Sequence, residues 1–211
     1  MKIVITGASR GIGAGMAEAY RDRGEEVVGT TRDGPHVLDV TSPESQADFA
    51  RSLADAPVDL LICNAGVYLD KGDALDTGFG ADLWARSFAT NVTGVFLTVQ
   101  SLLPNLRAAS GKIAIISSQM ASHERAPGGS YIYRASKAAV LNVGRNLAAD
   151  LRPDGIAVGI YHPGWVVTDM GGEGADITVD QAVSGLLTRF DALDMASTGA
   201  FLTWDGRVHP Y

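Results

Sequence analysis

A glycine-rich turn near the N-terminus constrains the fold of this chain more than any other feature of its sequence. The turn lies between a β-branched run, residues 3–5, and an amphipathic segment that extends from about residue 12 to residue 23. Glycine permits tight turning, and the backbone amides at the start of a helix form a natural site for a phosphate group. A strand, such a turn and a helix in this order predict a dinucleotide-binding unit. The turn residues expected to hold the dinucleotide are Gly7, Ser9, Arg10, Gly11, Ile12 and Gly13.

Strand-like and helical segments alternate along the rest of the chain. Strands are expected at 27–30, 37–38, 58–63, 112–117, 156–161 and 200–203. Helices are expected from Ser42, from about 82 to 107 with an interruption near 91–94, at 131–151, and from Thr178 to about 193. This alternation predicts an α/β fold, with one domain over residues 1–211. The fold would be a Rossmann-type, doubly wound parallel sheet of about seven strands, whose ligands bind beyond the carboxyl ends of the strands.

The charge and cysteine content narrow the function classes. The chain has 17 basic and 24 acidic residues, a balance that does not favour nucleic acid or an anionic membrane as partner. Its single cysteine, Cys63, fits a reducing compartment, and we find neither a signal peptide nor a stretch long enough to span a bilayer. The sequence therefore predicts a cytoplasmic protein. The four histidines show no metal-ligand spacing, so no metal site is expected.

The end of the second predicted strand bears on the choice of dinucleotide. An acid there usually holds the ribose hydroxyl of NAD, but here Thr31 takes its place and Arg32 follows. Because arginine pairs well with phosphate, NADP(H) is favoured over NAD(H), with Arg10 as a second contact. In the alternative reading, Asp33 binds the ribose and Arg32 is solvated. The four residues from Asp33 to His36 are too few for a helix, so the helix between strands 2 and 3 is expected to be missing.

Tyr133 and Lys137 are the two residues of this sequence that most strongly indicate its chemistry. Two residues four apart on a helix lie on one face, and a nearby ammonium stabilises the tyrosine phenolate and lowers its pKa. Such a tyrosine can donate a proton to a carbonyl oxygen, or remove one in the reverse reaction.

With these motifs in order, residues 1 to about 170 resemble the short-chain dehydrogenase/reductase family. The resemblance implies that Ser118 binds the substrate oxygen beside Tyr133, with Ser117 as the alternative if the register differs by one. It also implies that Asn91 supports a water-linked proton path to Lys137, and that Asp39 contacts the adenine unless it only begins a helix. Thr168 would hold the nicotinamide carboxamide. Further cofactor contacts are implied for Tyr133, Lys137, Asn64, Ala65, Gly66, Pro163 and Gly164.

The segments 133–139, 162–172 and 204–206 look like the C-factor/sniffer-like carbonyl reductases within that family. This narrower resemblance implies an NADPH-dependent oxidoreductase that reduces a small aldehyde, ketone or quinone. The alternatives are an NADP(H)-binding signalling or sensor protein and an NAD-linked alcohol dehydrogenase. Residues 171–177 would form a mobile lid. The family includes dimers, tetramers and monomers, so the oligomeric state stays open. Residues expected to line the pocket are Met120, His123, Arg125, Trp165 and Met170.

Overall fold

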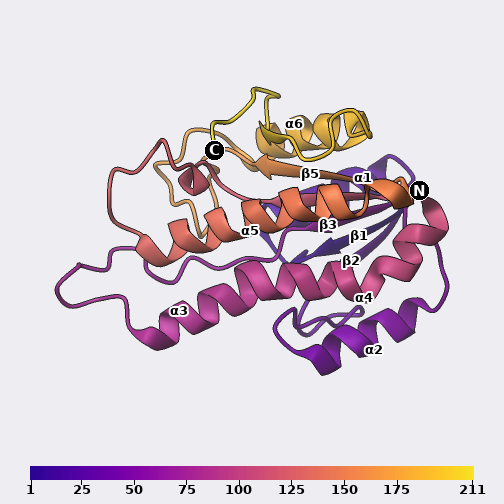
Figure 1. The fold of residues 1–211 in the computed structure, drawn as a ribbon, viewed down its shortest axis with the longest axis horizontal. Coiled ribbons are helices and arrows are strands. Elements are labelled where there is room, and N and C mark those ends of the chain that lie inside the picture. Colours follow the sequence, from indigo (N-terminus) through magenta and orange to yellow (C-terminus); the bar gives the residue numbers. More distant parts are fainter.

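The computed structural model describes residues 1–211, which form one parallel sheet of six strands in the order β2-β1-β3-β4-β5-β6 (Figure 1). The order runs outward in both directions from β1 and β3, as expected for a doubly wound sheet. The Rossmann-type α/β fold predicted from the alternation is therefore confirmed. The strands are β1 (Lys2–Thr6), β2 (Glu26–Thr30), β3 (Leu60–Cys63), β4 (Lys112–Ile116), β5 (Ala157–His162) and β6 (Phe201–Thr203).

Helices cover both faces of this sheet (Figure 1). Successive side chains of a strand point to opposite faces, and in β1 the residues Ile3 and Ile5 join one apolar core while Val4 joins the other. The first core packs against α1 and α6, and the second against α2, α4 and α5. The helices are α1 (Gly11–Asp22), α2 (Pro43–Leu53), α3 (Ala81–Phe88), α4 (Gly94–Ala109), α5 (Tyr131–Asp150) and α6 (Val179–Ala192).

The connection between β2 and α2 departs from the prediction in one respect. The expected strand at 37–38 does not form, and Val37 makes only an isolated parallel bridge with Thr31. Residues 33–36 form a tight turn, which leaves too little extended chain for a ladder. No helix lies between Thr30 and Pro43, as predicted. The buried side chains of Leu38 and Val40 pack with Phe49 of α2, so coil residues cover this part of the sheet.

The predicted interruption in the long helical region is a π-helical turn, Ala89–Thr93, between α3 and α4. Asn91 lies in this turn, and such π turns occur often at functional sites. The predicted capping box at the start of α6 is also present: the Thr178 hydroxyl accepts the Gln181 backbone N–H, and the Gln181 side chain accepts the Thr178 N–H. No helix has both the length and the apolar character required to cross a bilayer.

Candidate active site

The predicted catalytic residues meet at the carboxyl edge of the sheet. Ser118 follows β4, and Tyr133 and Lys137 lie one turn apart near the start of α5. The Nζ atom of Lys137 is 5.7 Å from the centre of the Tyr133 ring, and the Ser118 side chain interacts with the Tyr133 hydroxyl. All three side chains are buried. The fold thus brings together a hydroxyl pair and an amine from two separate parts of the chain.

Lys137 is a buried amine without a carboxylate partner. Its Nζ donates a hydrogen bond to the backbone oxygen of Ile116 at 2.9 Å, and burial lowers its pKa to about 8. A buried cation without a counter-charge is costly, and such groups gather at functional sites. Gly66 lies beside it: a Cβ at this position would be 3.4 Å from Lys137 Nζ and 3.3 Å from Asn91 Oδ1.

Tyr133 differs from the prediction in its proton affinity. We expected the ammonium of Lys137 to lower its pKa, but burial raises the pKa of Tyr133 to about 12, with smaller contributions in the same direction from Tyr68 and Asp70. The Ser118 side chain opposes this rise. Desolvation of the phenolate is the largest cause of this shift, and Lys137 is not among the groups that lower the pKa. The hydroxyl therefore stays protonated at neutral pH, which is the state that a proton donor requires.

Two residues that the sequence did not single out support Tyr133. The ring of Tyr68 stacks on the ring of Tyr133, with centroids 4.3 Å apart and planes 22° apart, and its hydroxyl bonds to Ser130. The buried carboxylate of Asp70 accepts hydrogen bonds from the first backbone N–H groups of α5. Both residues lie in the coil after β3, where no spacing or periodicity marks them.

The side chains of Asn91 and Ser117 form hydrogen bonds within the protein. The Asn91 side-chain amide donates to Val67 O and Ser136 Oγ, and its Oδ1 accepts the Val67 N–H, so the side chain holds the π turn against the coil after β3. The proton path through Asn91 stays a prediction. Ser117 Oγ donates to the backbone oxygen of Lys137 at 3.0 Å, which favours Ser118 as the serine that faces a substrate.

The segment after β3 packs against the glycine turn and is joined to it by hydrogen bonds. The Asn64 side-chain amide donates to Thr6 O and Gly7 O, and the Thr6 hydroxyl accepts the N–H groups of Asn64 and Ala65. A Cβ at Gly13 would lie 2.2 Å from Gly7 O and 2.5 Å from Asn64 Nδ2, so only glycine fits there. These contacts fix the shape of the turn in front of α1. In the remainder of the turn, Ser9 and Arg10 are exposed and Ile12 packs toward the core.

Comparisons with known proteins agree with this arrangement. Residues 1–177 match the short chain dehydrogenase family. The chain belongs to the short-chain dehydrogenase family. C-signal of Myxococcus xanthus is 39% identical over 165 residues, which cover 77% of this chain and 98% of that protein. The NADPH-bound carbonyl reductase from chicken fatty liver is 29% identical, with a TM-score of 0.90, and the match covers 100% of this chain and 98% of that one.

Carbonyl reductase Sniffer of D. melanogaster has the same fold, with a TM-score of 0.92 at 23% identity, and the match covers 100% of this chain and 99% of that one. The resemblance inferred from the motifs, including the C-factor/sniffer-like group, is confirmed. The chain is an oxidoreductase by family, and members of this family bind a nicotinamide cofactor and act on small molecules.

In this short-chain dehydrogenase, the segment after β5 lies against the glycine turn. Arg10 forms an exposed ion pair with Asp169, with Nη1 and Oδ2 2.7 Å apart. A Cβ at Gly11 would meet the Thr168 side chain at 3.4 Å. Pro163 and Gly164 begin this segment, and Gly164 has a φ of +92°. The residues predicted to hold the cofactor from this side therefore lie at the correct edge.

The residues predicted to select the dinucleotide lie after β2. The side chains of Arg32 and Asp33 are exposed, and neither forms an ion pair. Asp39 accepts hydrogen bonds on Oδ1 from both the hydroxyl and the N–H of Thr41, which lower the pKa of its carboxyl. These contacts lie in the turn just before α2, and the Asp39 N–H donates to Ser45 Oγ in the first turn of that helix, which supports the helix-entry role of Asp39. Its contact with adenine stays a prediction.

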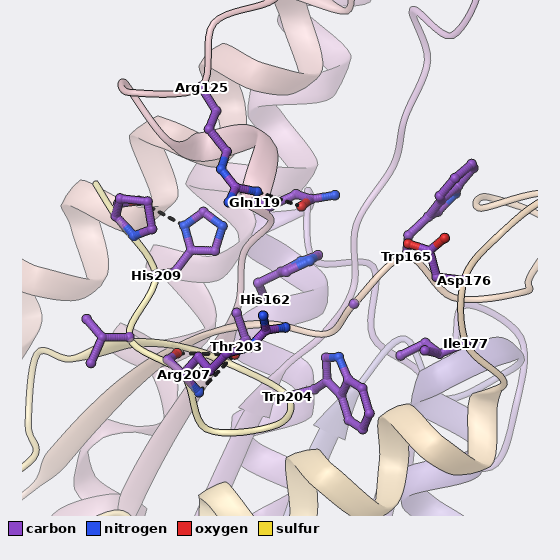
Figure 2. Close-up of a pocket in the computed structure, with 13 residues that line it drawn as sticks. Gln119, Arg125, His162, Trp165, Asp176, Ile177, Thr203, Trp204, Arg207 and His209 are labelled. Carbon is purple, nitrogen blue, oxygen red and sulfur yellow. Dashed lines mark hydrogen bonds between the residues drawn. The ribbon is translucent and has the colours of Figure 1, made fainter.

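A cavity of about 290 Å³ lies beside the loop that follows Ser118, and Gln119 forms part of its lining (Figure 2). Of the predicted pocket residues, Arg125 and Trp165 line it, whereas Met120, His123 and Met170 do not. Asp176 and Ile177 of the predicted lid form part of its wall. Cys63 of β3 is buried outside this lining, and burial raises the pKa of its thiol to about 12. The lining is Gln119, Arg125, His162, Gly164, Trp165, Asp176, Ile177, Thr203, Trp204, Arg207, Val208, His209 and Pro210.

Proposed function

We propose that this protein is an NADPH-dependent reductase of small carbonyl compounds, with Tyr133 as the proton donor. The observation that carries the proposal is the buried group of Ser118, Tyr133 and Lys137 at the sheet edge, beside a glycine turn built for close approach of a ligand. We retain the prediction of a cytoplasmic location and leave the oligomeric state open.

The mechanism follows from the protonation states. NADPH, when bound, supplies a hydride to the carbonyl carbon. Ser118 holds the carbonyl oxygen by a hydrogen bond, and Tyr133 transfers its hydroxyl proton to that oxygen, so the carbonyl becomes an alcohol. The ammonium of Lys137 stabilises the phenolate left on Tyr133 after transfer. Because Tyr133 is protonated at neutral pH, it is in the state that the reductive step requires.

The chain's own residues fit such a cofactor. Gly7 packs against Ala65, and Gly13 packs against Gly7 O and Asn64, which fixes the turn. The N-terminus of α1 has no side-chain cap, so its N–H groups can bind a pyrophosphate. The hydroxyl of Thr31, directly after β2, is buried without a hydrogen-bond partner and packs against Gly34. The free guanidinium of Arg32 supports NADP(H). Recognition of the ribose by Asp33 remains the alternative.

The direct test measures NADPH oxidation by the purified protein with a panel of aldehydes, ketones and quinones. Tyr133→Phe should lower turnover by at least about 100-fold. Tyr131→Phe is the matched control, because Tyr131 is an exposed tyrosine two residues earlier on the same helix, and its activity should stay near that of the wild type. Equal activity of Tyr133→Phe and wild type would overturn the proposal.

A signalling or sensor role is the second candidate, favoured by the 39% identity to C-signal. It predicts saturable NADPH binding without turnover of any carbonyl in the panel. The retained Ser118, Tyr133 and Lys137 weigh against it, because binding alone needs no proton donor. An NAD-linked alcohol dehydrogenase is the third reading, and it predicts faster alcohol oxidation with NAD than with NADP.

A further inference from the structure

Part of the wall of the cavity beside Ser118 is formed by polar residues that have no role in the proposed chemistry. Gln119 and Arg125 come from the loop after β4, His162 ends β5, and Arg207 and His209 come from the tail after β6 (Figure 2). Three separate parts of the chain thus converge on one space. Gln119 directly follows Ser118, so the loop that carries the proposed substrate-binding serine also contributes to this wall.

Two buried histidines in this wall have unmet hydrogen-bonding groups. His162 is 8% exposed and His209 is 3% exposed, and their rings meet edge to face at 5.8 Å. His162 Nδ1 and His209 Nε2 have no hydrogen-bond partner. His209 Nδ1 lies 2.8 Å from Pro210 O and must carry the proton there, because a carbonyl only accepts, so Nε2 is an acceptor in the neutral ring. Buried polar groups are rarely left unpaired, and those that line a cavity can be met by a ligand.

Two arginines, Arg125 and Arg207, lie in the same wall as the two histidines. Burial, followed by the charges of His209, Arg125 and Arg207, lowers the pKa of His162 to about 3, while Asp205 opposes them. Arg207 pairs with Asp205 at 2.9 Å. The Arg125 guanidinium makes only one long hydrogen bond, 3.4 Å to Gln119 Oε1, and has no carboxylate partner. Asp176 lies beside Trp165, on the opposite side of the cavity from Arg125 (Figure 2).

We propose that this cavity binds a carboxylate, so that the substrates are carbonyl compounds that carry an acid group. Arg125, whose side chain is exposed, is the principal anion contact, and the unpaired His162 Nδ1 and His209 Nε2 lie in the same wall. The inference rests on the proposed reductase function, which it deepens by naming a substrate class. The volume of about 290 Å³ suits a small oxo acid or aldehyde acid.

Kinetics with a matched pair of substrates test this proposal. We would compare 4-carboxybenzaldehyde with its methyl ester, methyl 4-formylbenzoate, at saturating NADPH. The acid should have a kcat/KM at least about tenfold above that of the ester. Arg125→Gln should remove this preference by raising the KM of the acid at least about tenfold more than the KM of the ester. Arg51→Gln, at an exposed arginine of α2 that pairs with Asp48, is the control and should keep the preference.

A binding experiment separates failure of this inference from failure of the reductase function. Trp165 and Trp204 line the cavity, so benzoate, which cannot be reduced, should quench their fluorescence in a saturable way, and Arg125→Gln should weaken this binding about tenfold. Methyl benzoate should bind more weakly than benzoate. Turnover of both aldehydes without preference, or benzoate binding unchanged in Arg125→Gln, would overturn the carboxylate site. Benzoate binding without turnover of any carbonyl would overturn the reductase function alone.

Discussion

The carboxylate of Asp70 accepts hydrogen bonds from the backbone N–H groups of Ile132 at 2.9 Å and Tyr133 at 3.2 Å, more than sixty residues further along the chain. A helix N-terminus is usually capped by the residue just before it. Here that residue is Ser130, whose left-handed backbone makes no side-chain capping bond. Asp70 therefore caps α5 from a distance and fixes the turn that carries Tyr133, where a negative charge is favourable.

Replacement of Asp70 tests this capping role. Asp70→Ala leaves the buried N–H groups of α5 unpaired, so we expect a loss of about 1–3 kcal/mol in the free energy of unfolding. Asp70→Asn keeps one acceptor oxygen and should lose less. Activity should fall in the same order, because Tyr133 loses its position. Urea unfolding and NADPH oxidation measure both effects. The exposed Asp76→Asn is the control, and equal stability of Asp70→Ala and Asp76→Asn would contradict the role.

Lys137→Met should separate stability from activity. The pKa of Lys137 falls from 10.5 to about 8 on folding, so between these pH values the unfolded chain holds a proton that the folded chain has released. Its contribution to stability therefore rises with pH across this window. At neutral pH the variant should unfold at an equal or higher temperature, because a buried unpaired charge is removed, while activity falls at least about 100-fold. Its stability should lack the rise between pH 8 and 10.5, which thermal unfolding across that range would detect.

Arg32→Gln tests the choice of cofactor. If the guanidinium holds the 2′-phosphate, the variant should bind NADPH about tenfold more weakly and NADH as before. Titration of protein fluorescence with each cofactor measures this. Asp33→Asn should leave both affinities unchanged. A selective loss of NADH binding in Asp33→Asn would instead support the reading in which Asp33 holds the ribose.

Gly13→Ala tests the close approach that holds the glycine turn. The added Cβ would lie 2.2 Å from Gly7 O, so the turn must open, and we expect a destabilisation of more than about 2 kcal/mol together with weaker NADPH binding. Gly174→Ala is the control, because nothing lies within 4 Å of a Cβ there. Thermal unfolding of the two variants, followed by NADPH titration, gives the comparison. Similar behaviour of the two variants would mean that the turn tolerates a side chain.

The sequence predicted those parts of the molecule that depend on local patterns. The strand, glycine turn and helix at the N-terminus, the one-turn spacing of Tyr133 and Lys137, and the capping box at Thr178 are set by neighbours along the chain, and each appears as predicted. The segment at Val37 was predicted as a strand from its apolar residues. It fails to form one because the turn before it leaves no length for a ladder.

Long-range packing decided what the sequence could not predict. Asp70 reaches α5 only because the coil after β3 folds over the helix, and no periodicity marks an acid in that coil. The raised pKa of Tyr133 depends on how many side chains enclose it, which the spacing of Lys137 does not reveal. His162 and His209 are 47 positions apart in the chain, so their meeting at one cavity follows only from β5 and β6 being neighbours in the sheet.

The cavity beside Ser118 draws six of its thirteen lining residues from Thr203 onward, namely Thr203, Trp204, Arg207, Val208, His209 and Pro210. The match to the short-chain dehydrogenase family ends at residue 177. The residues proposed for catalysis and the six residues of this wall are therefore encoded in separate stretches of the chain. Mutations in the last ten residues can reshape what the pocket accepts without altering the catalytic group, so new substrate preferences can evolve, or be engineered, by exchanging this tail alone.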